Sequence, residues 1–187
     1  MARSIPGPGE PNAGRPRKGS IIWLAESRRS GGHGALMFLD LDNFKPVNDR
    51  HGHEAGDLLL IEAATRLKAY VRAMDSVARF GGDEFVVLLS DLPADEAEAR
   101  LRTRHLADKI RLSLAAPYAL TLGREGQAET TIEHHCTASI GIALFIDHRL
   151  TADDILREAD AAMYRAKEAG RNQIRFHDGL DHHSGQS

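Results

Sequence analysis

One stretch decides the fold: Arg79-Phe80-Gly81-Gly82-Asp83-Glu84-Phe85. Apolar residues lie on both sides of its glycine pair, so it predicts a β-hairpin with a tight turn. Glycine permits the positive φ that a two-residue hairpin turn needs. The turn would present two adjacent carboxylates, which are hard oxygen ligands suited to Mg²⁺ bridging a phosphorylated substrate. An acidic hairpin tip can also be plain solvated surface, so this interpretation needs support from elsewhere in the chain.

That support comes from a segment about forty residues upstream. Residues Ala35–Asp42 form a short apolar run that ends in carboxylates, which is typical of a buried strand that delivers ligands at its C-terminal end. Lys45 follows within reach of the same site, and Pro46 stands where a helix can begin. A glycine-punctuated polar turn, His51–Asp57, then precedes a long apolar helix. Two acidic strand ends, a lysine and an amide-rich loop predict a site for a nucleoside triphosphate with metal ions.

Taken together, these residues resemble the GGDEF domain of diguanylate cyclases, enzymes that condense two GTP molecules into cyclic di-GMP and release pyrophosphate. The resemblance covers roughly Ala35 to His177. It rests on the order and spacing of Asp40-Leu41-Asp42-Asn43-Phe44-Lys45, Asn48-Asp49, Gly52-His53, Gly56-Asp57, Gly81-Gly82-Asp83-Glu84-Phe85, Ala159-Asp160-Ala161-Ala162-Met163-Tyr164, Lys167 and Gly170-Arg171-Asn172.

Helices interleaved with hairpins predict an α+β domain with a mainly antiparallel central sheet flanked by helices. The resemblance implies the palm-like architecture shared by nucleotidyl cyclases and polymerase palms. Residues 1–20 are rich in Pro, Gly and Arg and are expected to be a disordered or linker-like extension. The domain is expected over residues 21–177, with an atypical N-terminal part at 21–34, and 178–187 are expected to be a flexible tail. Helices are predicted near 21–29, 58–71, 94–115 and 152–168, and further strands near 118–122, 130–137, 139–145 and 173–176.

The resemblance implies two Mg²⁺ ions per active site, with Mn²⁺ able to substitute. Their implied ligands are Asp40, Asp83, the backbone carbonyl of Leu41 and, in addition, Glu84. Asp83 is also the implied proton acceptor for a ribose 3′-hydroxyl, which attacks the α-phosphate of the other GTP. Lys45 would stabilise the negative charge that develops on the phosphoryl oxygens. Because each domain holds one GTP, catalysis implies a homodimer.

Matching positions assign guanine recognition to Asn48 and Asp57, with His53 nearby. A carboxylate can accept hydrogen bonds from guanine N1 and N2, and an amide both donates and accepts. The resemblance also places Gly81 and Gly82 in the substrate site.

Two cations near the C-terminus are candidates for binding phosphate. Lys167 and Arg171 lie four residues apart at a predicted helix end, so we expect them on one face, within reach of the β- and γ-phosphates. Helix C-termini also attract cations for structural reasons alone.

A regulatory site is predicted from Arg72 and Asp75. They have the Arg-x-x-Asp spacing and precede the glycine pair by five residues, as in the inhibitory product site of the family. Arginine can stack on guanine, and aspartate can accept hydrogen bonds from its edge. Such a pair is also common at helix ends. The position predicts that cyclic di-GMP binds there and inhibits.

Composition excludes several classes of protein. The net charge of −3 gives no general basic field, so a nucleic-acid partner is not expected. A single cysteine, Cys136, rules out an internal disulfide framework and fits a reducing, cytoplasmic compartment. No apolar stretch approaches the roughly 20 residues needed to span a bilayer, so no transmembrane segment is expected.

The sequence departs from the family pattern near its start. Family members usually carry an Asp-x-Leu-Thr-Gly-Leu-x-Asn-Arg segment, of which only Pro11-Asn12 is a faint echo here. Two hypotheses therefore stand: a diguanylate cyclase with a product-inhibition site, and a catalytically silent GGDEF module that binds GTP or cyclic di-GMP and signals through a partner. The intact acids favour the enzyme, and the altered segment favours the module. Another nucleotidyl cyclase activity is disfavoured by Asn48 and Asp57.

Overall fold

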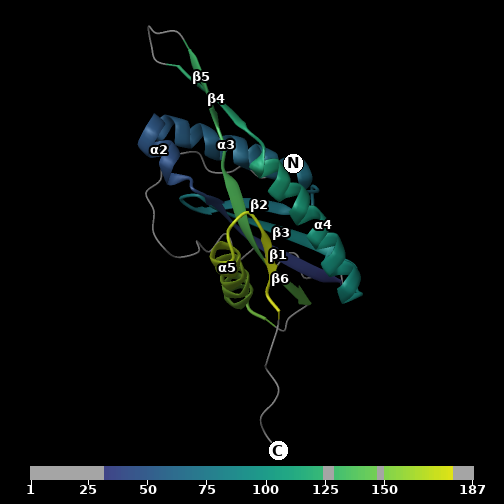
Figure 1. Ribbon diagram of the computed structural model, residues 1–187. Helices are drawn as coiled ribbons and strands as arrows, with labels where there is room; N and C mark the ends of the chain where they lie inside the picture. The colour runs from purple at the N-terminus through teal and green to yellow at the C-terminus, as the bar shows by residue number, and fades with distance from the viewer. Residues whose placement is uncertain (1–31, 124–128, 147–149, 179–187) are drawn as a thin grey trace, which may run out of the picture.

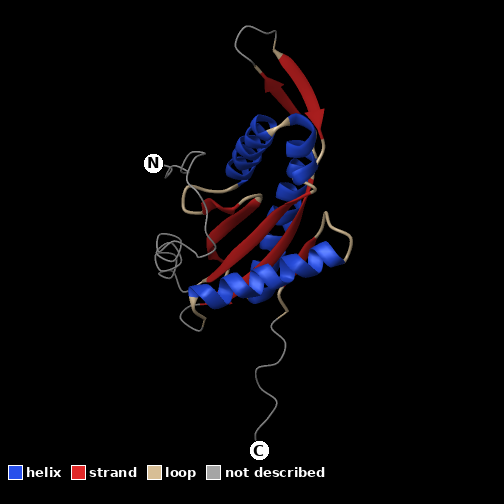
Figure 2. Cartoon of the chain, turned by 90° about the vertical axis from the view of Figure 1, so that its left-hand side faces the viewer, coloured by secondary structure: helices blue, strands red, loops and turns tan. Residues whose placement is uncertain are grey.

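The computed structural model describes residues 32–123, 129–146 and 150–178, which form one sheet with helices on both faces and a projecting hairpin (Figures 1 and 2). The expectations for residues 1–20, for a helix at 21–29 and for a tail at 179–187 lie outside the described residues. None of the described helices is long and apolar enough to cross a membrane. The strands are β1 (His33–Asp42), β2 (Ser76–Gly81), β3 (Glu84–Leu92), β4 (Tyr118–Leu122), β5 (Thr130–His134), β6 (Thr137–Ile146) and β7 (Ile174–Phe176), and the helices are α2 (Lys45–His51), α3 (His53–Tyr70), α4 (Glu96–Ala115) and α5 (Ala152–Glu168).

The central sheet has the strand order β2-β3-β1-β6-β7. Every neighbouring pair is antiparallel except β6 and β7, which are parallel. The prediction of a mainly antiparallel central sheet flanked by helices is therefore confirmed. Strands β4 and β5 form a separate two-stranded ribbon that extends away from the sheet (Figure 2).

The middle strand β1 is buried on both faces. Met37 and Leu39 pack in the core with α3 and α4, whereas Leu36 and Phe38 pack in the core with α5. A strand covered on both sides carries apolar residues at successive positions instead of alternating ones. This is why residues 35–39 form a continuous apolar run in the sequence.

Side-chain caps mark the N-terminal ends of helices α4 and α5. Thr151 accepts a hydrogen bond from the Asp154 backbone N–H, and the Asp154 side chain accepts one from the Thr151 backbone, which forms a capping box at the start of α5. Asp95 caps α4 by accepting from Glu98 N. The predicted bounds of α5 are confirmed, whereas α4 begins two residues after the predicted residue 94 and ends at the predicted residue 115.

Two other predicted boundaries are wrong. Helix α3 begins at His53, five residues before the predicted Leu58, because Gly52, with a φ of 87°, makes the break and the polar residues after it form the first helical turns. The predicted strand over 130–137 is divided at residues 135 and 136. Its first part pairs with β4, whereas Thr137 pairs with Asp42 of the central sheet, so the chain changes partner between them.

The hairpin turn is present, but the reason given for its glycines is wrong. Gly81 pairs with Glu84, so the loop has two residues, and yet among the described glycines only Gly52 and Gly170 have a positive φ. A register shift between Arg79 and Gly81 distorts the strand before the turn instead. A Cβ at Gly81 would lie 2.7 Å from Glu84 Oε2, so this glycine makes room for the carboxylate.

Candidate active site

Three carboxylates gather where the end of β1 meets the tip of the β2–β3 hairpin. Asp40 lies opposite Glu84 in the pairing of β1 with β3. The Leu41 backbone N–H donates to the Asp83 carbonyl oxygen over 3.1 Å, which ties the hairpin tip to the central strand. The structure thus brings together the predicted metal-binding residues, which are more than forty positions apart in the sequence.

This cluster is partly buried and crowded with negative charge. Burial raises the pKa of Asp40, the hydrogen bond from Lys167 opposes that shift, and the charge of Asp83 adds to it. Burial also raises the pKa of Glu84, followed by repulsion from Asp40 and Asp83. Lys167 Nζ lies 2.7 Å from Asp40 Oδ2 and is the cation that meets the cluster. One ammonium does not balance three carboxylates, so the site favours additional positive charge.

The donor set fits the kind of site that Mg²⁺ prefers. Among the described residues, no three His, Cys, Asp or Glu side chains lie close enough to enclose a metal ion by themselves. Mg²⁺ is usually bound by one or two carboxylates, with water and substrate phosphates as its other ligands. Asp40, Asp83 and Glu84, with the Leu41 carbonyl, therefore remain the predicted ligands of ions that would arrive with a triphosphate.

The charge crowding predicts how stability depends on pH when no metal is present. The pKa values of Asp40 and Glu84 are raised above their ordinary values of 3.8 and 4.5, so the folded state binds more protons than the unfolded state between the ordinary and the raised values. The free energy of unfolding therefore falls as pH rises through that window. We expect Asp83→Asn, which removes one source of repulsion, to raise the neutral-pH Tm of the metal-free protein by a few degrees.

Thermal unfolding between pH 4 and pH 7, with and without Mg²⁺, checks this expectation. Addition of Mg²⁺ should raise the Tm of the wild type more than that of Asp83→Asn. A metal-free variant that melts below the wild type at neutral pH would contradict the electrostatic account.

The predicted guanine-binding residues lie at the junction of α2 and α3. Asn48 is on α2, whereas His53 and Asp57 are exposed in the first turns of α3. A Cβ on Gly56 would lie 1.9 Å from Asn48 Oδ1, so the absence of a side chain lets the amide lie directly against α3. This role of Gly56 was not predicted from the sequence. A glycine inside a helix lowers helix stability, so its presence in α3 is the signal that a close contact needs it.

Lys45 is exposed at the start of α2. Within the described residues it makes no hydrogen bond or ion pair, so the structure does not bring it into contact with the acids. Lys167, which was assigned to the phosphates, makes that contact instead.

The expectation that Lys167 and Arg171 share one helix face is wrong. Helix α5 ends at Glu168, and Gly170, with a φ of 111°, follows the helix end. The Arg171 backbone N–H closes that end by donating to Ala166 O over 3.0 Å. Arg171 itself has a φ of 62° and is exposed on the turn between α5 and β7.

Arg72 and Asp75 lie on the turn between α3 and β2. The Asp75 carboxylate accepts hydrogen bonds from the backbone N–H groups of Arg72, at 2.9 Å, and Ser90, at 3.1 Å. Asp75 therefore fixes the turn against β3, while Arg72 is exposed. This arrangement leaves the guanidinium accessible to a ligand.

Asp42 has a role that sequence reasoning missed. Its side chain accepts hydrogen bonds from Thr137 Oγ1 and Ser139 Oγ, each at 2.7 Å, and from the Asn172 backbone N–H at 3.0 Å. The residue is only 2% exposed. It joins the end of β1 to β6 and to the turn that carries Arg171.

A mainly antiparallel sheet that places acids from its central strand and from a hairpin tip beside a lysine has the architecture of the cyclase and polymerase palm class. The family model described as "Diguanylate cyclase, GGDEF domain" matches residues 21–173. The chain belongs to this family.

Individual proteins agree with the family match. The chain is 46% identical over 143 residues to the bifunctional diguanylate cyclase/cyclic di-GMP phosphodiesterase MucR of Pseudomonas aeruginosa. The aligned region covers 76% of this chain but only 18% of MucR. The crystal structure of the GGDEF domain of TpbB from P. aeruginosa matches with a TM-score of 0.69 and 38% identity, over 84% of this chain and 90% of that one. The GGDEF domain of DgcB from Caulobacter crescentus, solved in complex with cyclic di-GMP, matches with a TM-score of 0.67 and 26% identity, over 86% and 85% of the two chains.

Proposed function

We propose that this domain is a diguanylate cyclase that condenses two GTP molecules into cyclic di-GMP and two pyrophosphates. The observation that carries the proposal is the cluster of Asp40, Asp83 and Glu84 beside Lys167, in a chain of the GGDEF family. A module that only binds nucleotide has no chemical need for adjoining acids that repel one another. Because the substrate is GTP, we place the reaction in the cytoplasm.

In the proposed reaction, Asp83 accepts the proton of the attacking ribose 3′-hydroxyl. Asp40, Asp83, Glu84 and the Leu41 carbonyl would hold two Mg²⁺ ions, or Mn²⁺ in their place. When bound, these ions supply positive charge that lowers the pKa of the hydroxyl and neutralises the triphosphate. The tie between Leu41 N and Asp83 O keeps the acids of the two strands at a fixed separation.

Three cations are proposed to bind the triphosphate. Lys45 is assigned to the charge that develops around the α-phosphate, and Lys167 and Arg171 to the β- and γ-phosphates. The ammonium of Lys167 stands on a flexible stem next to Asp40, so it can turn from the carboxylate to a phosphate without movement of the helix.

Guanine selectivity is proposed to depend on Asn48 and Asp57, with Gly81 and Gly82 leaving the backbone near the nucleotide open. Among the described residues other than Gly82 and its two chain neighbours, no heavy atom lies within 4 Å of a Cβ built on Gly82. We expect Asp57→Ala to lower the preference for GTP over ATP, measured as a ratio of kcat/KM values, by about tenfold or more. The carboxylate would lose two hydrogen bonds that only guanine can donate.

Glu54→Ala is the matched control for that substitution, because Glu54 is an exposed acid at the start of the same helix. It should leave the preference unchanged. An Asp57→Ala protein that keeps full GTP selectivity would show that the base is recognised elsewhere.

Catalysis is proposed to need a homodimer. Each domain would hold one GTP, and the 3′-hydroxyl of one nucleotide must reach the α-phosphate of the other. Specific activity should therefore rise with protein concentration until the dimer saturates.

The product is proposed to inhibit by binding at Arg72 and Asp75. We expect calorimetric titration of the wild type with cyclic di-GMP to show binding, and Arg72→Ala to weaken it by about tenfold or more, because hydrogen bonds to a charged group are lost. Lys68→Ala, which removes a positive charge four residues earlier, is the control. Equal heats for the wild type and Arg72→Ala would overturn the assignment.

The second candidate is the silent module that binds GTP or cyclic di-GMP and signals through a partner. The departure from the family segment near the start of the sequence favours it. Nucleotide binding without any product would support it over the enzyme.

A further inference from the structure

The turn that carries Arg171 is held by contacts from outside its own helix. Arg171 and Asn172 both have a positive φ, of 62° and 47°. This conformation costs roughly 1 kcal/mol for each residue that has a Cβ. External contacts must therefore keep the turn in one shape.

The first anchor is Asp42, at the end of β1. Its Oδ2 accepts a hydrogen bond from the Asn172 backbone N–H, and Thr137 and Ser139 hold the carboxylate from β6. Because all three donors are satisfied by one buried carboxylate, this side of the turn is fixed to the central sheet.

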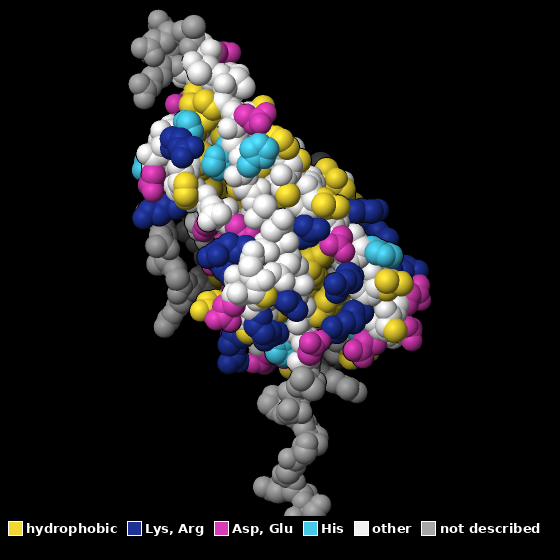
Figure 3. All heavy atoms as spheres, viewed as in Figure 1, with side chains coloured by type: hydrophobic (Ala, Val, Ile, Leu, Met, Phe, Trp, Pro, Cys, Tyr) yellow, Lys and Arg dark blue, Asp and Glu magenta, His cyan; other side chains and the backbone are white. Residues whose placement is uncertain are grey.

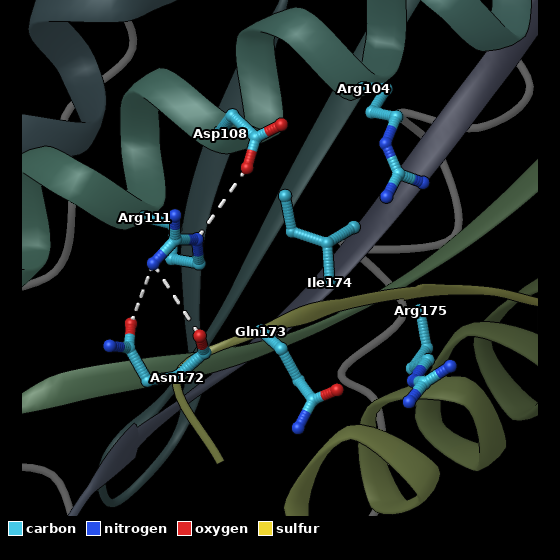
Figure 4. Close-up of a pocket in the computed structure, with 7 residues that line it drawn as sticks. All are labelled: Arg104, Asp108, Arg111, Asn172, Gln173, Ile174 and Arg175. Carbon is cyan, nitrogen blue, oxygen red and sulfur yellow. Dashed lines mark hydrogen bonds and ion pairs between the residues drawn. The ribbon is translucent and has the colours of Figure 1, made fainter. Parts of the chain in front are cut away.

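The second anchor is Arg111, on α4. Its Nη1 donates to Asn172 Oδ1 over 3.0 Å and reaches the Asn172 carbonyl at 3.5 Å (Figure 4). Asp108, one turn earlier on the helix, lies 3.5 Å from Arg111 Nε and orients the guanidinium. Asn172 is therefore held from two sides: its backbone N–H bonds Asp42 of β1, and its side-chain amide oxygen bonds Arg111 of α4.

Simple charge does not distinguish Arg111 from its neighbours. The pocket beside the turn is also lined by Arg104 and Arg175, and Lys and Arg side chains gather on this face of the molecule (Figure 3). Arg104 makes no hydrogen bond or ion pair in the described part of the chain, whereas Arg111 bonds the turn directly. A positioning role is thus specific to Arg111.

We propose that Asp42 and Arg111 are positioning residues for triphosphate recognition: acting through Asn172, they hold the turn so that Arg171 meets the terminal phosphates. This inference rests on the proposed function. Both residues bond other protein groups, the Asp42 carboxylate to Thr137, Ser139 and Asn172 and the Arg111 guanidinium to Asn172. Because the proposal gives neither of them a contact with the nucleotide, the base and the α-phosphate should be bound as before when either is replaced.

The test compares Arg111→Ala with Arg104→Ala, which removes the same charge from the same pocket. Dissociation constants are measured by calorimetry with Mg²⁺ for GMP and for a GTP analogue with a methylene bridge between its α- and β-phosphates. We expect Arg111→Ala to raise the dissociation constant of the analogue by about 2- to 10-fold and to leave the dissociation constant of GMP unchanged. Arg104→Ala should change neither.

A double-variant cycle with Arg171→Ala identifies the path. If Arg111 acts through Arg171, Arg111→Ala should cause no further loss in an Arg171→Ala background. Asp42→Asn, which keeps the size of the side chain, should behave in the same way.

Three results would overturn the inference. The losses of affinity from Arg111→Ala and Arg171→Ala could be additive, Arg111→Ala could weaken the binding of GMP and of the analogue equally, or it could bind the analogue as tightly as the wild type does. A wild type that binds the analogue no better than GMP would instead overturn the assignment of Lys167 and Arg171 to the phosphates, and with it this inference. Failure of the inference alone and failure of the proposed function are thereby distinguished.

Discussion

Replacing Asp83 with alanine is expected to lower the rate of cyclic di-GMP formation from GTP by about a thousandfold or more. The substitution removes a proposed metal ligand and the proposed proton acceptor together, and a positioned base alone is worth about 10²- to 10⁴-fold. Asp83 lies on a two-residue loop whose backbone is tied to β1 through Leu41 N, so the fold should survive the change.

The measurement is initial velocity by chromatography, with unfolding temperature recorded in parallel. Asp153→Ala is a suitable control, since Asp153 is an exposed acid at the far end of α5 from Lys167. It should keep its activity. An Asp83→Ala protein with a tenth or more of the wild-type rate would mean that Asp83 is not the base.

Gly141→Ala is expected to produce the largest loss of stability. A Cβ on Gly141 would lie 2.0 Å from Ala159 O, 2.1 Å from Met163 N and 2.7 Å from Met163 Cα. These are backbone atoms of α5, which cannot turn aside as a side chain can. Helix α5 would have to move away from β6, and with it Lys167.

We expect the free energy of unfolding to fall by about 3 kcal/mol or more, which is at or beyond the usual upper range for overpacking. Urea unfolding measures the change. Gly123→Ala is the control, because the closest contact of its Cβ with the described residues beyond its neighbours would be Glu129 Cγ at 3.7 Å, an ordinary contact. A loss below about 1 kcal/mol for Gly141→Ala would show that α5 packs against β6 more loosely than the contacts at Gly141 indicate.

Elements set by local signals were predicted well from the sequence. The predicted helix over 152–168 and the predicted strand over 118–122 agree with the observed bounds of α5 and β4. The predicted end of the helix at residue 115 is also the observed end of α4. In each of these places, residues adjacent in the sequence determine the local conformation.

Two other predictions failed because a distant contact decides the local structure. Whether Thr137 belongs to β5 or β6 depends on its pairing with Asp42 of β1. Arg171 leaves the helix because the turn after α5 is fixed by the central strand and by α4. Helical spacing carries no information about either contact.

The site shows the same division. The proximity of Asp40 to Asp83 and Glu84 could be predicted because the family resemblance implied the palm-like topology, and the structure has these residues together. The resemblance did not predict the ion pair between Lys167 and Asp40. Nor did it predict that the Asp42 carboxylate accepts hydrogen bonds from three protein donors. Both depend on side-chain packing, which motif spacing does not encode.

The most direct test of the central claim is to strip any bound nucleotide from the purified protein, incubate it with GTP and Mg²⁺, and quantify cyclic di-GMP and pyrophosphate together. The account predicts one cyclic di-GMP for every two pyrophosphates with the wild type and neither with Asp83→Ala. Intact GTP binding with no cyclic di-GMP at any protein concentration would contradict it and would favour the silent module.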